Sequence, residues 1–75
     1  MNLYLLQVKP GTQISVLCFY KRFLVISATE ESARNLCEER AKALGDKNYN
    51  LWLDKDLSHC ILISMDEEQI FFAQN

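Results

Sequence analysis

The start of the chain is apolar and ends at a turn signal. Residues 2–8 are rich in leucine, tyrosine and valine, a composition that favours a β-strand. Pro10 and Gly11 follow, and this pair is typical of a tight turn, because proline presets one φ angle and glycine accepts a positive one. We therefore predict a first strand over residues 2–8 that ends at this turn.

Residues 13–28 alternate with a period of two, which is the pattern of a strand. Lys21 and Arg22 interrupt the apolar character, which resumes at Phe23. We predict one long, bent strand, with two shorter strands broken at residues 20–22 as the alternative. If one parity holds along the whole stretch, the face toward the helix carries Ile14, Val16, Cys18, Leu24, Ile26 and Ala28.

A helix is predicted next, over residues 30–44. Thr29 can cap its N-terminus, and Gly45 can end it in the left-handed conformation. Glu30 and Glu31 suit the positive end of the helix dipole. The expected buried stripe consists of Ala33, Leu36, Cys37, Ala41 and Leu44. Two i,i+4 ion pairs are expected on the solvent side, Glu30–Arg34 and Glu38–Lys42.

The rest of the chain predicts two more strands. Trp52 lies in an apolar triplet inside a polar stretch, and we expect it to be buried at one end of the sheet, with an exposed binding anchor as the alternative. Strands are predicted over residues 58–64 and 69–73, joined by a hairpin connection at 65–68. The order ββαββ indicates one α+β domain over residues 1–75, a small antiparallel sheet with one helix packed on one face.

The charge balance argues against direct nucleic-acid binding. Eight Lys and Arg residues stand against ten Asp and Glu, and the basic residues are scattered along the chain. No apolar run approaches the roughly twenty residues that span a bilayer, and the N-terminus lacks the basic region of a signal peptide. The three cysteines form an odd set without close spacing, which favours reduced thiols. We therefore expect a cytoplasmic protein without membrane association.

The residues do not predict catalysis, a metal site or a cofactor. Cys18, Cys37, His59 and Cys60 have the composition of a zinc site. However, neighbours on a strand point to opposite faces, so one ion could not easily bind both His59 and Cys60. Cys37 and Cys60 are expected in mid-helix and mid-strand, where the local structure does not lower a thiol pKa. We predict that the protein is not an enzyme.

An apolar surplus on one strand face is the main functional signal. A single helix covers only one face of a sheet, and Leu17, Phe19, Phe23 and Val25 have the parity opposite to the helix-facing set. Large exposed apolar patches mark interaction sites. The candidate interaction surface therefore comprises Leu17, Phe19, Phe23, Val25 and Trp52. The expected partner is a protein, either a second copy in a homodimer, because cores of this size are thin, or a different protein.

The alternative hypothesis is a small ligand-binding or enzymatic domain. A chain of this length has little volume for a pocket unless the pocket forms between subunits. The site would then lie at a subunit interface and use Tyr4, Tyr20, His59 and Trp52.

Several segments carry a resemblance to known proteins. They are residues 1–6 (MNLYLL), the strand-to-helix segment 23–34 (FLVISATEESAR), Trp52, residues 60–64 (CILIS) and residues 70–75 (IFFAQN). Together they resemble a family of small uncharacterised proteins encoded by bacteriophages and prophages, whose members often have a glycine where this chain has Ser64. The resemblance implies an accessory protein in the cytoplasm of a bacterial host that binds a host protein, for example as an inhibitor of a defence or transcription complex. It supplies no catalytic residues.

Overall fold

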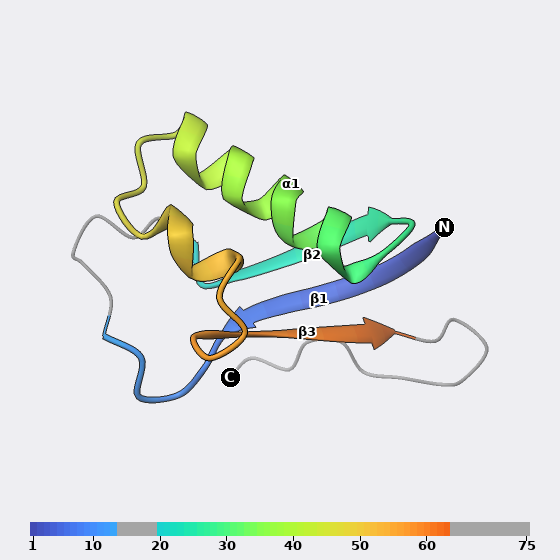
Figure 1. Ribbon diagram of the computed structural model, residues 1–75, viewed down its shortest axis with the longest axis horizontal. Coiled ribbons are helices and arrows are strands. Elements are labelled where there is room, and N and C mark those ends of the chain that lie inside the picture. The colour runs from blue at the N-terminus through green and yellow to red at the C-terminus, as the bar shows by residue number, and fades with distance from the viewer. Residues whose placement is uncertain (14–19, 64–75) are drawn as a thin grey trace, which may run out of the picture.

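β1 (Asn2–Val8) is the central strand of the sheet (Figure 1). In the computed structural model, which describes residues 1–13 and 20–63, its neighbours are β2 (Arg22–Ser27) and β3 (Ser58–Ile63). Both neighbours run antiparallel to β1. The predicted small antiparallel sheet is therefore confirmed, with the described strands in the order β2-β1-β3.

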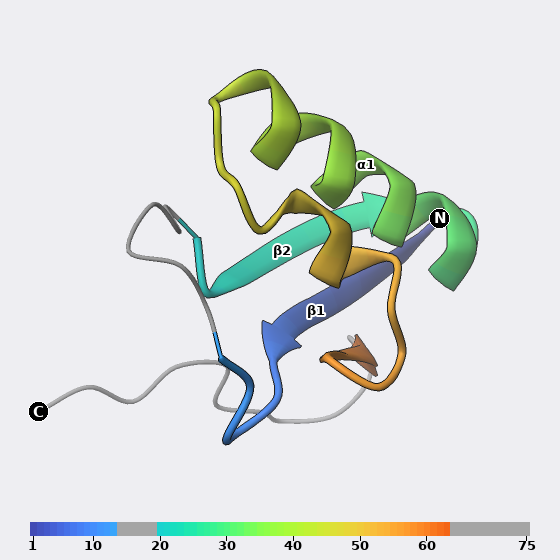
Figure 2. The ribbon, with the colours of Figure 1, turned by 60° about the vertical axis from the view of Figure 1, so that its left-hand side comes forward.

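Two helices connect β2 to β3 and lie on the same side of the sheet. α1 (Glu30–Ala43) packs mainly against β2 and against η1 (Tyr49–Trp52), a short 3₁₀ helix. Figure 2 shows α1 and η1 above the sheet, with β1 and β2 running beneath them. This arrangement confirms an α+β fold with one α-helix on one face of the sheet.

Part of the predicted strand pattern lies outside the described residues. This applies to the predicted strand over residues 69–73 and to residues 14–19 of the predicted long strand. Within the described part, the second strand begins at Arg22, which is the second residue of the Lys21–Arg22 interruption in the sequence.

The ends of α1 are determined by the local signals that predicted them. The Thr29 side chain accepts a hydrogen bond from the backbone N–H of Ser32 at 3.1 Å, which satisfies one N–H of the first turn. Gly45 follows the helix with φ of 81°, in the left-handed region that glycine adopts without strain. The predicted cap and stop residues are therefore confirmed.

The buried stripe of α1 differs from the predicted one. Ala33, Cys37 and Ala41 are buried as expected, but Leu36 and Leu44 are exposed. The small side chains allow α1 to lie close to its neighbours, and the large residues beside this stripe turn outward. The prediction for Leu36 and Leu44 was wrong because the buried stripe of this helix consists of small residues, and these two leucines lie beside that stripe.

Trp52 lies in the core. It is fully buried, and its ring meets the ring of Phe23 edge-on, with the centroids 5.0 Å apart. The other buried members of the cluster come from β1, α1 and η1, namely Tyr4, Leu6, Ala33, Cys37, Ala41 and Leu51. The interpretation of Trp52 as a core residue is confirmed, and its inclusion in an exposed interaction surface was wrong.

The two faces of β2 are the reverse of the predicted ones. Phe23 and Val25 are half-buried and pack against the core cluster, whereas Leu24 and Ile26 are exposed. The prediction carried one parity through residues 20–22, although this strand is described only from Arg22 onward. Both faces of β2 are apolar, so alternation alone could not distinguish the inner face from the outer one.

Candidate functional site

The face of the sheet opposite α1 carries a continuous set of aliphatic side chains. Leu5 of β1 lies opposite Leu24 of β2 on one side and opposite Ile61 of β3 on the other. Leu3 lies opposite Ile26 of β2 and opposite Ile63 of β3, and Ile63 is buried although it shares this face. Directly paired residues point to the same face, so these side chains adjoin. We call the five that are not buried, Leu3, Leu5, Leu24, Ile26 and Ile61, the open face.

The open face is exposed to an extent unusual for aliphatic side chains. Ile26 is 67% exposed, Leu24 46% and Ile61 44%. Leu3 and Leu5 on the central strand between them are half-buried. Scattered exposed aliphatic residues are ordinary, but a set gathered on one sheet face is typical of an interaction site. Gln7 and its cross-strand neighbours Arg22 and His59 give one end of this face a polar border.

A groove runs between β2 and α1. Its volume is about 540 Å³. Phe23, Leu24 and Val25 line it on the strand side, and the helix side is formed by Leu36, Cys37, Glu39, Arg40 and Ala43. Leu24 belongs to both the groove and the open face, so the two apolar surfaces meet along β2. We call this feature the β2–α1 groove.

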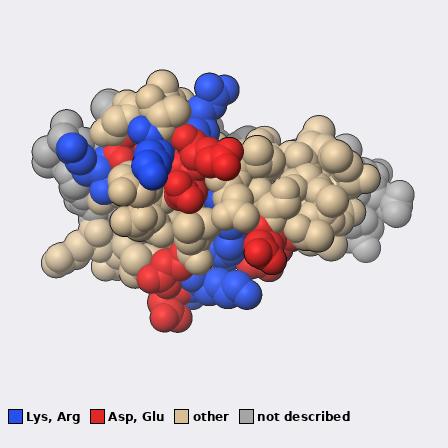
Figure 3. All heavy atoms as spheres, turned by 45° about the horizontal axis from the view of Figure 1, so that its top comes forward, with Lys and Arg blue, Asp and Glu red and all other residues tan. Residues whose placement is uncertain are grey.

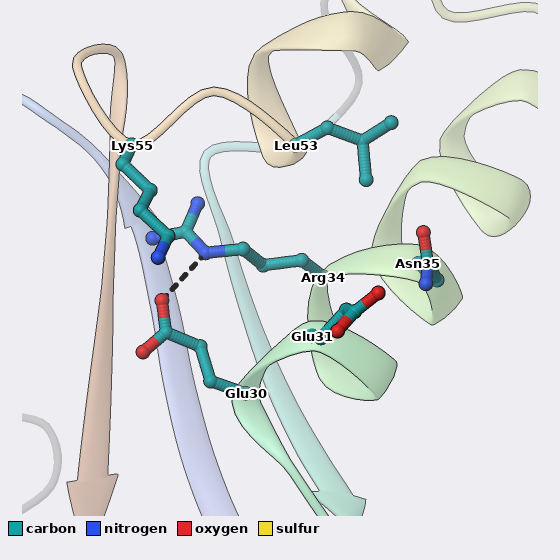
Figure 4. A pocket seen from close by; sticks show the side chains of 6 residues that line it. All are labelled: Glu30, Glu31, Arg34, Asn35, Leu53 and Lys55. Atoms are coloured by element: carbon teal, nitrogen blue, oxygen red, sulfur yellow. Dashed lines mark hydrogen bonds and ion pairs between the residues drawn. The ribbon is translucent and has the colours of Figure 1, made fainter.

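A second hollow lies between the first turns of α1 and the segment after η1 (Figure 4). Its volume is about 370 Å³, and five of its six lining residues are polar: Glu30, Glu31, Arg34, Asn35, Leu53 and Lys55. Figure 4 shows the Arg34 side chain extending from α1 toward Glu30 and Lys55. Four charged side chains line this hollow, and the bonding of Arg34 bears on whether it could bind a ligand.

The Arg34 guanidinium is held by the protein itself. Its Nε donates to Glu30 Oε2 at 2.8 Å, and its Nη1 donates to the Trp52 carbonyl at 3.0 Å. Ser58 receives two more bonds, from Nη1 to its Oγ at 2.9 Å and from Nη2 to its carbonyl at 3.1 Å. Because Arg34 is buried and makes four hydrogen bonds, its role here is to join α1, η1 and β3. The Glu30–Arg34 pair was predicted, but its placement on the solvent side was wrong for Arg34.

The described cysteines are poorly suited to nucleophilic or metal chemistry. Burial raises the pKa of the Cys37 thiol to about 12, the nearby Cys60 adds to this, and Arg34 opposes it. Burial also raises the pKa of Cys60, followed by the negative charge of Glu30. A thiol that stays protonated at neutral pH is a weak nucleophile and a weak metal ligand.

The residues of the alternative ligand site do not form a pocket, because three of them share the core cluster and His59 lies apart from them. Tyr4 and Trp52 are in the core, and Tyr20 stacks against Phe23 with ring centroids 4.8 Å apart. His59 is exposed and has the strand parity of the open face, on the opposite side of the sheet from Tyr4. His59 and Cys60 point to opposite faces, as predicted, and within the described residues no three His, Cys, Asp or Glu side chains gather at metal-binding distance.

The structure does not place the predicted interaction residues together on an exposed face. Phe23, Val25 and Trp52 face the helix or lie in the core, while Leu17 and Phe19 lie outside the described residues. The residues that sequence reasoning missed are Leu24, Ile26 and Ile61, which are exposed on the open face. The signal that could have identified them is the pairing register with β1, because Leu5 fixes which side chains of its neighbours share its face.

Charged side chains of both signs are interspersed over the surface that includes α1 (Figure 3). In that view, no field of a single sign forms that would suit a polyanion such as nucleic acid. Among the described helices, none combines the length and the apolar character needed to cross a membrane.

The fold and these surfaces define a small open-sheet α+β domain with an apolar face. Comparison with protein-family models, with curated proteins and with solved structures gave no match. The resemblance to small phage-encoded proteins therefore stays a prediction.

Proposed function

We propose that the protein is a non-catalytic interaction module that binds another protein through the open face. The observation that supports this most strongly is the joint exposure of Leu24 and Ile26 on β2 and of Ile61 on β3, the two strands that flank β1. Burying such side chains against a partner is favourable by about 25 cal/mol per Å² of apolar surface, whereas leaving them in water gives no stability.

The surroundings of the open face suit a protein partner better than a small ligand. Its centre is aliphatic, and its polar border at Gln7, Arg22 and His59 resembles the polar rim of protein–protein interfaces. The two hollows on the α1 side offer less. In the hollow beside η1, the Arg34 guanidinium is bonded to other groups of the protein. The β2–α1 groove is open and has the protonated Cys37 thiol in its lining.

We further propose that the partner is a protein of a bacterial host and that this chain acts as a phage-encoded accessory protein, such as an inhibitor of a defence or transcription complex. The resemblance of residues 23–34 and 60–64 to small phage proteins supports this choice of host. The proposed place of action is accordingly the bacterial cytoplasm.

Affinity capture with tagged protein from a bacterial lysate tests the proposal. Ile61→Lys places a charge in the open face on β3, and Leu44→Lys places the same charge on an exposed leucine after α1, away from this face. We expect one stoichiometric host protein to be retained by the wild type and by Leu44→Lys and to be lost from Ile61→Lys. Circular dichroism of both variants checks that each is folded.

Two outcomes would contradict the proposal. Retention of the same host protein by Ile61→Lys would exclude the open face as the contact surface. Retention of no protein by the wild type, in lysates of hosts of several bacterial groups, would argue against a host-directed binder.

A further inference from the structure

The outer edge of β2 has backbone groups that point away from the sheet. The Val8 N–H donates to the Lys21 carbonyl at 3.1 Å, and the register pairs Leu6 with Phe23 and Tyr4 with Val25. Because hydrogen-bonded and non-bonded pairs alternate in an antiparallel ladder, Phe23 and Val25 bond to β1. Leu24 and Ile26 consequently direct their N–H and C=O groups outward.

Beyond its first residue, this edge has little of the usual protection against strand pairing. Within the described part of the chain, β2 is an edge strand with no further strand beyond it. β2 begins with the charged and exposed Arg22, but the residues from Phe23 to Ile26 include no proline and no charge, two features that natural edge strands use to prevent association. Leu24 and Ile26 are also exposed, so an added strand would find both hydrogen-bonding groups and apolar surface.

The charges at the two ends of β2 indicate which strand would fit. Lys21 precedes the strand, and Glu31 lies in the first turn of α1 just after it; both are exposed. Two copies of β2 in antiparallel orientation place the basic end of each beside the acidic end of the other. A parallel pair would place like charges together. The edge is therefore complementary to itself about a two-fold axis.

The β2–α1 groove lies along this same edge. Its helix side includes Leu36, which is exposed although it is a large aliphatic residue. In a two-fold arrangement through β2, the helices of the two copies lie on the same face of the joined sheet, so the groove and Leu36 of each copy face the other copy.

We propose that the chain forms a homodimer in which the β2 strands of two copies pair antiparallel about a two-fold axis at Val25. In this register, Leu24 of each copy lies opposite Ile26 of the other, and their outward N–H and C=O groups form the new ladder. The two open faces then join into one continuous sheet surface, which stays available to a different partner. The dimer contact is an edge contact and goes beyond the proposed binding of a host protein through the open face.

Sedimentation equilibrium across a wide range of concentrations tests this dimer with a matched pair of variants. Ile26→Pro removes the outward N–H without removing a bond to β1, whereas Ile26→Ala shortens the same side chain and keeps the N–H. We expect a dimer for the wild type and for Ile26→Ala. For Ile26→Pro we expect the dissociation constant of the dimer to rise by at least roughly 10-fold, because the symmetric contact loses two hydrogen bonds.

A charge exchange gives a second test that does not depend on proline being tolerated. Lys21→Glu and Glu31→Lys should each weaken the dimer, and the double variant should restore it, because the proposed register places Lys21 opposite Thr29 of the other copy, two positions before Glu31. The amide protons of Leu24 and Ile26 should also exchange more slowly as the protein concentration rises.

The proposal would be overturned by a wild-type chain that stays monomeric at every concentration. It would also be overturned by an Ile26→Pro variant that folds and dimerises like Ile26→Ala, or by a double charge variant that is no better than the single ones. Ile61→Lys separates this test from that of the proposed function, since it should lose the host protein and keep the dimer.

Discussion

Arg34 joins three parts of the chain that are distant in sequence. Its bonds reach Glu30 in α1, the Trp52 carbonyl at the end of η1, and Ser58 at the start of β3. Ser58 in turn donates its hydroxyl to the Leu51 carbonyl at 2.7 Å, so the cluster also satisfies backbone groups of the η1 region. A single charged side chain thereby positions the return of the chain to the sheet.

Replacing Arg34 should destabilise the protein strongly. Arg34→Met keeps much of the side-chain volume but leaves the Trp52 and Ser58 carbonyls without this donor. Because breaking a buried charged network leaves its partners uncompensated, we expect a loss of about 3 kcal/mol in the free energy of unfolding. Urea denaturation measures this, with the exposed Arg40→Met as the matched control, for which we expect a change within about 0.5 kcal/mol. Equal effects of the two variants would contradict the role assigned to Arg34.

The Cys37 thiol should make the stability fall in alkaline solution. In the unfolded chain it ionises near its ordinary pKa of 9.0, whereas burial raises the pKa in the folded protein to about 12. The folded state therefore holds the proton longer, so this contribution to stability is complete below pH 9 and is lost as the pH rises toward 12. Between these two pKa values, we expect the free energy of unfolding to fall by about 1.4 kcal/mol per pH unit.

The measurement compares the wild type with Cys37→Ala in urea denaturation at a series of alkaline pH values. Other groups that titrate there are common to both proteins, so the difference between the two curves isolates the thiol. A difference that is constant across pH 9 to 12 would show that the thiol ionises equally in both states.

Residue-level predictions succeeded where the cause is local. Glu30 and Arg34 were expected to pair because they are four positions apart on a helix, and they do pair at 2.8 Å. The burial of Arg34 depends on Ser58 and on the backbone of Trp52, which approach only after the chain has turned back. No signal within the helix shows that these acceptors will be present.

At the scale of elements, α1 was predictable because its ends carry their own signals. Thr29, the two glutamates that follow it and Gly45 act within one or two turns, so the sequence itself contains their partners. The prediction placed the helix at residues 30–44, and α1 spans Glu30–Ala43 with Leu44 as its C-cap.

The Thr29 cap should account for a measurable part of the stability of α1. Thr29→Ala removes the oxygen that accepts the Ser32 N–H, and such a loss costs about 1 kcal/mol in the free energy of unfolding. Thr29→Ser keeps the oxygen and serves as the control. We expect urea denaturation to place Thr29→Ser near the wild type and Thr29→Ala below it, whereas equal loss in both would show that the threonine methyl group matters instead.

The faces of β2 were not predictable from the strand alone. Phe23 and Val25 are as apolar as Leu24 and Ile26, so a period of two identifies two faces without saying which one is inside. The choice is made by the pairing with β1, where Leu6 lies opposite Phe23, and by the Trp52 ring that meets Phe23. Both partners are distant in sequence.

At the scale of the whole molecule, one layer of helix on a three-stranded sheet makes a thin core. A domain of 75 residues has a total stability of roughly 4–11 kcal/mol at the usual value per residue. Trp52 is its largest fully buried side chain. Loss of this one ring should therefore remove a large part of the total.

We expect Trp52→Ala to lower the free energy of unfolding by about 3–5 kcal/mol. Far-UV circular dichroism in urea is the suitable probe, because Trp52 is the only tryptophan in the chain and its fluorescence is lost with it. Leu53→Ala, at the exposed next position, is the control and should stay close to the wild type. Similar midpoints for the two variants would mean that Trp52 does not hold the core together.

The existence of an uncovered apolar face could be predicted from the whole-molecule pattern, but not its membership. A single helix covers one face of a sheet, and the chain has more apolar residues than that core requires. Which residues occupy the open face depends on the register of β1 with both neighbours. The residue types of Leu24, Ile26 and Ile61 do not indicate that register.

The central position of β1 has a consequence for the chain during its synthesis. β1 is made first, yet one of its two edges is completed only when β3 leaves the ribosome. At about 5–20 residues per second, the stretch from Ser27 to Ile63 takes about 2–7 s to translate. For that interval the nascent chain presents an aliphatic strand with an unpaired edge, so chaperone binding should matter most between the emergence of β2 and that of β3.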